Sequence, residues 1–306
     1  MIDFLRSYHD NKTQFEDTVL NEDLFDNVQI TLDTKTGERE YPITCSRGGF
    51  SILIDKYRAY INCVPKMILF NFLKLKLLSN KNLSLSNFKT GIDCINGVID
   101  HNYTKLSGVN IGFTIPTSTA GKDIIKMNVL MHNYKHCNHD LVVNKKKYTK
   151  EFVYHNYKIM LSADKNGRNK NLLKIVLKLN KSAGFRKFGI NNINDLTQKK
   201  KLTDLFNLFM KRFDELIIVD TLQYFEGKDY EELENYLNYT YWSTLSSAKS
   251  SQTKSRHKKK FEALINKYNL GSLKAKLKQE LNKSFRENIT LLKHKYHGKH
   301  QNIIKK

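Results

Sequence analysis

A run of basic residues around His257 is the segment of this sequence best suited to contact phosphate groups. Lys254-Ser255-Arg256-His257-Lys258-Lys259-Lys260 leads directly into an amphipathic segment with Phe261 and Leu264 on one face. Positive charges at the start of a helix oppose its dipole, so they stabilise the helix poorly and suit phosphate contact better. A solvated charge run is the alternative. The predicted DNA-binding residues are Lys254, Arg256, His257, Lys258, Lys259 and Lys260.

A second cluster of reactive residues is the histidine-rich segment 132–139. His132 and His136 are four residues apart, and on a helix this spacing would place both imidazoles on one face. Such a pair could bind a divalent metal, Mg or Mn, that polarises a phosphate during strand cleavage. Ordinary surface or loop histidines are the alternative interpretation, and they carry more weight for a pattern this short.

Two tyrosines are candidates for nucleophilic attack on DNA, which leaves the phosphate on the tyrosine oxygen. Tyr154 and Tyr157 lie in a predicted strand, 152–161, just ahead of Asp164 and Lys165. Asp164 could hold a metal, and Lys165 could neutralise a phosphate. The alternatives are packing tyrosines on a strand and an ordinary turn aspartate followed by a surface lysine.

Charge is distributed unevenly along the 306 residues, and this favours a polyanionic partner. The net charge is +22, from 52 Lys and Arg against 30 Asp and Glu. Residues 1–40 hold ten acidic and four basic side chains, whereas residues 249–306 hold three acidic and seventeen basic ones. Coding bias alone would spread lysines more evenly, so the C-terminal excess predicts nucleic-acid binding, because phosphate contacts release counterions.

Several other classes of protein are not indicated by the sequence. The cysteines at 45, 63, 94 and 137 form no Cys-x-x-Cys pair, which suits a reduced, cytoplasmic protein better than a disulfide scaffold or zinc ribbon. No P-loop, Gly-x-Ser-x-Gly or His-Glu-x-x-His motif occurs, so no nucleotide cofactor is expected. The most apolar stretch, 64–78, is interrupted by lysines, and neither a signal peptide nor a membrane partner is expected. The oligomeric state is not indicated.

The elements that must position these residues are strands in the first part of the chain and helices in the last. We expect an α+β fold with antiparallel sheet domains and packed helices, followed by a basic helical C-terminal region. Its parts would be an acidic segment at 1–40, a core at 41–190, a helical extension at 191–248 and the basic region at 249–306. The strands are predicted at 28–34, 51–54, 59–64, 107–116, 152–161 and 172–179. The helices are predicted from 86 to 99, 123–131, 202–217, 229–247, 255–268 and 272–292, with a break at Gly271 and a Ser-rich linker at 243–255.

The order of several short segments resembles the phage and plasmid replication proteins of the gene II and gene X type. The resemblance covers roughly residues 50 to 290. It rests on Gly108-Val109-Asn110-Ile111, Asp164-Lys165-Asn166-Gly167, the strand from Asn171 to Lys178, Gly189-Ile190 through Asp195-Leu196, and the basic run from Arg256 to Lys260.

The resemblance implies initiation of rolling-circle replication: the protein binds an origin, nicks one strand and holds the 5′ phosphate on tyrosine beside a divalent metal. This sequence departs from the family at three positions, because the family's tyrosine and two glutamates fall at Ala163, Val176 and near Ser107. Only Asp164 and Lys165 carry over as matched positions. The leading hypothesis is therefore a DNA-binding replication initiator with tyrosine nicking, and the alternative is a non-catalytic DNA-binding relative that regulates replication. An RNA- or ribosome-associated protein is a third class.

Overall fold

The computed structural model confirms the α+β class and divides the chain into two compact units. It describes residues 1–19, 25–73, 82–97, 99, 104–135, 141–143, 147–165, 169–224, 226–248 and 251–290. Unit 1 comprises Met1–Gly112, Lys178–Phe206 and Phe285–Lys306, and unit 2 comprises Phe113–Leu177 and Asn207–Ser284. No helix among these described residues is both long and apolar enough to cross a membrane.

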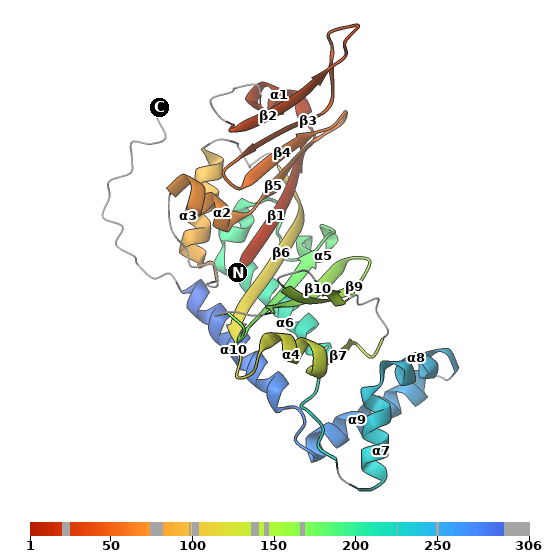
Figure 1. Ribbon diagram of the computed structural model, residues 1–306. Coiled ribbons are helices and arrows are strands. Elements are labelled where there is room, and N and C mark those ends of the chain that lie inside the picture. The colour runs from red at the N-terminus through yellow and green to blue at the C-terminus, as the bar shows by residue number, and fades with distance from the viewer. Residues whose placement is uncertain are drawn as a thin grey trace. The chain divides into compact units, whose positions relative to one another are not determined.

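Unit 1 is built on an antiparallel sheet that is covered by helices on one face (Figure 1). The strand order is β2-β3-β4-β5-β1-β6. The strands are β1 (Ile2–His9), β2 (Asn27–Leu32), β3 (Arg39–Arg47), β4 (Phe50–Ile54), β5 (Ala59–Cys63) and β6 (Lys105–Pro116), and β6 continues into unit 2. The strands predicted at 51–54 and 59–64 are confirmed as β4 and β5, which pair as a hairpin, and the turn between them forms because Asp55 accepts hydrogen bonds from the amides of Tyr57 and Arg58, both at 2.7 Å.

The covered face of this sheet carries the core of unit 1. Leu5, Ile52 and Ile61 point to that face, and each is at most 1% exposed. Three helices supply the opposing apolar side chains: α1 (Lys12–Val19), α2 (Pro65–Leu73) and α3 (Leu85–Asn96). Helix α3 starts where its N-cap residue Ser84 accepts a hydrogen bond from the amide of Asn87 at 3.2 Å. The unit also contains α5 (Ala183–Arg186) and the 3-10 turn η4 (Asn194–Thr197).

Unit 2 combines a second stretch of sheet with a small helical bundle. Next to the end of β6 lie β11 (Leu172–Leu179), β10 (Tyr157–Asp164), β9 (Lys147–Val153) and β8 (Leu141–Val143), in that order. A separate pair is formed by β7 (Val129–His132) and β12 (Leu216–Ile218). The helices are α4 (Gly121–Asp123), the π-helix η3 (Ile124–Asn128), α6 (Lys199–Asp214, which begins in unit 1), α7 (Lys228–Leu237), α8 (Tyr239–Ala248), α9 (Ser251–Lys267) and α10 (Ser272–Ile289, which ends in unit 1).

Helices α7, α8 and α9 pack around one aromatic cluster (Figure 1). Trp242 and Phe261 are fully buried in this cluster, and the Trp242 indole donates a 2.7 Å hydrogen bond to the carbonyl of Tyr236. Burying two large rings with a satisfied indole N–H fixes how the three helices meet. Tyr134, which follows β7, joins the cluster with its ring centroid 4.6 Å from that of Trp242.

Four of the predicted elements are wrong in detail. The single strand predicted at 152–161 is a hairpin, because the amide of Tyr154 donates to the carbonyl of Tyr157 at 2.9 Å and turns the chain between β9 and β10. The helix predicted at 123–131 is the short η3 followed by β7, because residues 129–132 pair with β12. The helix predicted at 202–217 ends at Asp214, and Leu216 and Ile217 belong to β12.

The helix predicted at 229–247 is divided at Asn238 into α7 and α8. The Ser-rich segment 243–255 is mostly helical rather than a linker, since α8 extends to Ala248 and α9 begins at Ser251. Serine has only a modest cost in helices, and packing of the neighbouring apolar residues outweighs it here. The predicted break near Gly271 is confirmed, with Asn269 in the left-handed conformation (φ 51°) between α9 and α10.

Candidate functional site

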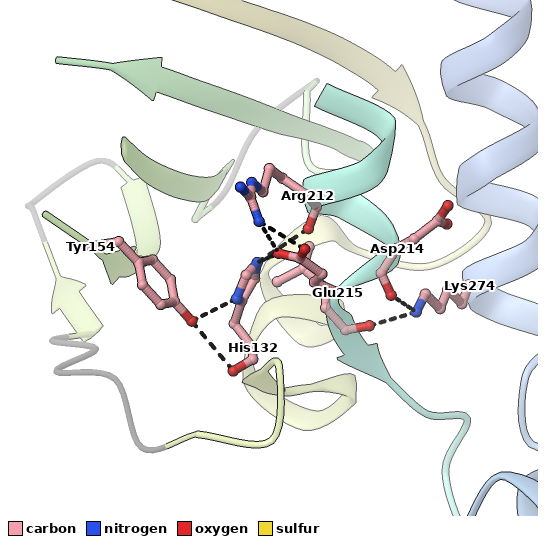
Figure 2. Close-up of polar contacts among 7 residues, drawn as sticks. His132, Tyr154, Arg212, Asp214, Glu215 and Lys274 are labelled. Carbon is pink, nitrogen blue, oxygen red and sulfur yellow. Dashed lines mark hydrogen bonds and ion pairs between the residues drawn. The ribbon is translucent and has the colours of Figure 1, made fainter. Parts of the chain in front are cut away.

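His132 lies at the end of β7 and is the centre of a buried polar cluster in unit 2 (Figure 2). Its side chain is fully buried. Nδ1 lies 2.7 Å from the hydroxyl oxygen of Tyr154, and Nε2 lies 3.1 Å from the backbone carbonyl oxygen of Arg212. A carbonyl can only accept, so Nε2 carries the proton and Nδ1 accepts the hydrogen bond that the Tyr154 hydroxyl donates. The contact therefore defines the tautomer of His132.

The charge state of His132 agrees with this hydrogen-bond pattern. Burial lowers the pKa of His132 to about 4, and the carboxylate of Glu215, 3.6 Å from Nε2, opposes that shift without overcoming it. The imidazole is therefore neutral at physiological pH. A neutral imidazole with its proton on Nε2 is able to accept a proton at Nδ1.

Arg212 and Glu215 form the second layer of the cluster. The guanidinium of Arg212 binds both carboxylate oxygens of Glu215, at 2.7 and 2.9 Å. It also lies 4.3 Å from the centre of the Tyr157 ring, and that ring stacks on Tyr154 with centroids 4.6 Å apart and planes inclined by 14°. His132, Tyr154 and Tyr157, which the sequence suggested for separate reasons, thus lie in one cluster.

Lys274 of α10 stabilises the turn that holds Arg212 and Glu215. The ammonium of Lys274 donates to the carbonyls of Asp214 and Leu216 at 2.7 and 2.6 Å, where α6 ends and β12 begins (Figure 2). A cation at this position satisfies the free carbonyls at the end of α6 and complements its dipole. Lys274 therefore helps to fix the backbone that presents the Arg212 carbonyl to His132.

The prediction that His132 and His136 share a helical face is wrong for His132, which lies on a strand. The chain then turns through Asn133 and Tyr134, with φ of 52° and 53°, and His136 lies outside the described residues. Both ring nitrogens of His132 already have partners, so the described residues do not fit a Mg or Mn ion held through this imidazole. No cluster of three or more His, Cys, Asp or Glu side chains suited to a metal occurs in the part of the chain that the structure describes.

Asp164 and Lys165 are separated from the His132 cluster. Tyr157 begins β10 and Asp164 ends it, so a strand of eight residues places them roughly 23 Å apart. The ammonium of Lys165 lies 5.3 Å from the centre of the Tyr148 ring. The positions where the resembled family has its tyrosine and one glutamate, Ala163 and Val176, are 4% and 2% exposed and belong to the core.

The basic run lies inside α9 rather than ahead of it, because α9 begins at Ser251. Most of its charges therefore lie beyond the first turn of the helix, where the dipole opposes them less than the sequence suggested. Two of the predicted DNA-binding residues are used internally: Lys260 pairs with Glu232 at 2.5 Å, and Nδ1 of His257 lies 3.0 Å from the hydroxyls of both Tyr236 and Tyr241. Arg256 and Lys259 are exposed.

Lys254 and Lys258 differ from these neighbours, and with Lys135 they form what we call the lysine face. Lys254 and Lys258 are one helical turn apart on α9. The ammonium of Lys258 lies 4.5 Å from the centre of the ring of Tyr134, the residue that precedes Lys135. Burial, followed by the positive charges of Lys258 and Lys135, lowers the pKa of Lys254. Like charges thus gather around two partly buried lysines, Lys254 and Lys258, which is an arrangement that an anion would stabilise.

No sequence pattern distinguishes Arg212, Glu215 or Lys135 from other polar residues. Arg212 and Glu215 are three residues apart at the end of an amphipathic helix, and this spacing is common in exposed ion pairs. Lys135 was one basic residue among many. Their roles depend on contacts with residues far along the chain, such as the hydrogen bond between His132 and Arg212, which are 80 residues apart.

Comparison with known proteins gives no relative: no family model, no curated protein and no solved structure matches this chain.

Proposed function

We propose that this chain is a DNA-binding protein of the replication-initiator type and that the lysine face of Lys135, Lys254 and Lys258 contacts the phosphate backbone. The observation that carries the proposal is the gathering of three ammonium groups where two of them, Lys254 and Lys258, are partly buried on α9. Mutual repulsion of this kind has a cost in free energy that bound phosphate would offset.

Ion pairing on the rest of α9 supports the same assignment. Lys260 and Lys267, which lie further along the helix, each pair with a carboxylate of α7, at 2.5 and 2.6 Å. Exposed pairs of this kind contribute little to stability, yet they reduce the positive field that a ligand meets. The carboxylates of α7 therefore weaken the positive field of α9 at Lys260 and Lys267.

A competition experiment tests this proposal. Duplex DNA, single-stranded DNA and RNA of equal length would compete for the full-length protein at physiological salt, with and without flanking DNA from the protein's own replicon as the specific competitor. Preference for DNA is the expected result. A clear preference for RNA would favour the RNA- or ribosome-associated class, and binding that does not weaken with added salt would contradict phosphate contact altogether.

A second candidate function is strand nicking by Tyr154, and the hydrogen bond from its hydroxyl to Nδ1 of His132 is the observation that favours it. His132 would accept the hydroxyl proton while the tyrosine oxygen attacks phosphorus. The new bond joins Tyr154 to phosphorus, the bond from phosphorus to the leaving deoxyribose oxygen breaks, and His132 returns its proton to that oxygen. A pKa of about 4 makes His132 a weak base, so slow cleavage is expected.

A nicking assay separates the two functions. Supercoiled plasmid that carries the gene and its flanks would be incubated with the protein and manganese, and the products would be treated with protease and run on a denaturing gel. Nicked circles that disappear with Tyr154→Phe and persist with Tyr157→Phe would support Tyr154 as the nucleophile. Tight, salt-dependent binding without nicking would favour the non-catalytic alternative, a DNA-binding relative that regulates replication.

A further inference from the structure

The sheet of unit 1 has a second face, opposite the three covering helices, and its side chains differ in kind from those of the core. Alternation along β1 places Leu5, Ser7 and His9 on the covered face, and Arg6 and Tyr8 on the other. The uncovered face continues across all five strands from β2 to β1, and we call it the open sheet face.

Strand register arranges the open sheet face in two parallel rows of side chains. The first is a polar row, in which directly paired residues are Asn27, Ser46, Ser51, Asn62 and Arg6, read from β2 to β1. The second row lies two residues along each strand and contains Gln29, Thr44, Leu53, Tyr60 and Tyr8. The rows are separated by about 7 Å, and each presents partly or fully exposed side chains.

Tyr8 and Tyr60 form an aromatic pair at one end of the second row. They are directly opposite each other on β1 and β5, so their Cβ atoms lie within about 5.5 Å. The guanidinium of Arg58 lies 4.9 Å from the centre of the Tyr8 ring. Flat rings beside a guanidinium plane provide stacking surfaces for aromatic ligands, including unpaired bases.

The charges around Tyr8 favour an anionic ligand. Arg58 and Lys105 share the carboxylate of Asp10, at 3.3 and 2.5 Å, and Arg58 also lies close to Asp55, whose carboxylate accepts a hydrogen bond from the Tyr60 hydroxyl. Arg6, in the polar row, donates to the neutral hydroxyl of Ser107 at 3.3 Å, and Arg186 is close enough to Lys105 to affect its ionisation. Four cations, those of Arg6, Arg58, Lys105 and Arg186, therefore lie around two carboxylates, those of Asp10 and Asp55, although residues 1–40 as a whole are acidic.

A hollow of about 430 Å³ extends along most of the polar row. Four members of that row line it, together with Phe4, Phe50, Asp26 and two residues of α2, Met67 and Asn71. Its edge is formed by Gly49, whose φ is +114° and where a Cβ atom would lie 2.6 Å from that of Met67. Amides, hydroxyls and the carboxylate of Asp26 beside two aromatic rings provide both donors and acceptors for the edge of a base.

We propose that the open sheet face binds single-stranded DNA, with bases stacked on Tyr8 and Tyr60 and with phosphates held by Arg6, Arg58 and Lys105. The proposal rests on the proposed DNA-binding function and adds to it a second binding surface, one that takes single-stranded DNA. Bases in a duplex are stacked on one another and cannot lie flat on side chains of a sheet, whereas unpaired bases can. A replication protein that binds duplex at one surface and an opened strand at another would hold a melted site.

The test measures binding of an oligothymidylate of about 16 nucleotides, and of a duplex of the same length, by fluorescence anisotropy. The full-length protein is compared with the double variant Tyr8→Leu, Tyr60→Leu, which keeps apolar bulk on the sheet and removes the rings. The expected result is a loss of single-strand affinity of at least about tenfold with unchanged duplex affinity. The variant Tyr8→Phe, Tyr60→Phe keeps the rings and should retain single-strand affinity within about threefold.

The controls distinguish failure of this proposal from failure of the proposed function. Tyr224→Leu, at a tyrosine in unit 2 that is 73% exposed, should change neither affinity. Equal single-strand affinity in the wild type and the leucine double variant would overturn the sheet-face proposal while duplex binding stands. Failure of the wild type to bind either probe would overturn both, and circular dichroism on each variant would show whether the sheet has kept its fold.

Discussion

The His132 cluster and the lysine face lie in the same unit, yet their polar groups differ in whether the chain itself provides partners of opposite character. In the His132 cluster each nitrogen of the imidazole has a partner within the chain, and Arg212 is bound to Glu215 through two hydrogen bonds (Figure 2). On the lysine face, burial and the positive charges of Lys258 and Lys135 lower the pKa of Lys254. A polar cluster that is satisfied internally stabilises the fold, whereas crowded like charges are stabilised by a ligand from outside.

The largest effect that this comparison predicts is a decrease in the free energy of unfolding in mild acid, caused by protonation of His132. The pKa of His132 is about 4 when folded, against an ordinary value of 6.5 when unfolded. The unfolded chain therefore binds the proton first as the pH falls, and the free energy of unfolding decreases from pH 6.5 down to pH 4 by about 3 kcal/mol. Above pH 6.5 this group causes no further change.

Urea unfolding at a series of pH values measures that slope. His132→Gln, which keeps a donor and an acceptor and cannot titrate, should lose stability overall and remove this part of the pH dependence. His132→Asn serves the same purpose if the longer amide does not fit. A slope that is unchanged in both variants would show that another group causes the acid lability.

A smaller effect is expected from the hydroxyl of Tyr154. Tyr154→Phe leaves Nδ1 of the fully buried His132 without its donor, and this should lower the free energy of unfolding by about 1 to 2 kcal/mol. The matched control is Tyr57→Phe, at a tyrosine that is 78% exposed in the turn between β4 and β5, and no measurable change is expected there. Equal free energies of unfolding for the two variants would show that the hydroxyl of Tyr154 does not stabilise the fold, and proton transfer to His132 would then be its remaining role.

The smallest effect concerns ionisation on the lysine face. Removing one positive charge with Lys258→Ala should raise the pKa of Lys254, because the charge of Lys258 contributes to lowering it. Burial is the larger cause, so the pKa should recover only in part. Side-chain NMR of Lys254 during a pH titration measures this shift, and Lys267→Ala at the far end of α9 is the control that should leave it unchanged.

Much of the fold could be predicted from local sequence patterns. The hairpin of β4 and β5 combines alternating apolar residues with a turn aspartate, and the face of α6 carries apolar residues at helical spacing. The segments that failed, Val129–His132 and Leu216–Ile218, pair with each other across more than eighty residues. Their apolar character suits either a helix or a strand, and only the remote partner decides between them.

The candidate site could be predicted only in part for a similar reason. His132 and Tyr154 were selected as reactive side chains, but their contact depends on the turn after β9 and on a carbonyl at the end of α6. The basic run forms one continuous part of α9, yet its members differ, because α7 supplies carboxylates to Lys260 and Lys267, whereas the ammonium of Lys258 lies over the Tyr134 ring. Composition cannot show which lysine is neutralised by a neighbouring helix.

The central claim, that the lysine face binds DNA phosphates, is tested most directly by the salt dependence of duplex binding. The affinity of the wild type would be measured over a range of salt concentrations beside two double variants, Lys254→Ala with Lys258→Ala and Lys260→Ala with Lys267→Ala. We predict that the first pair lowers the slope of log affinity against log salt by about two, and that the second pair changes it much less. Equal slopes for the two double variants would contradict the claim and reduce the lysine face to a solvated part of α9.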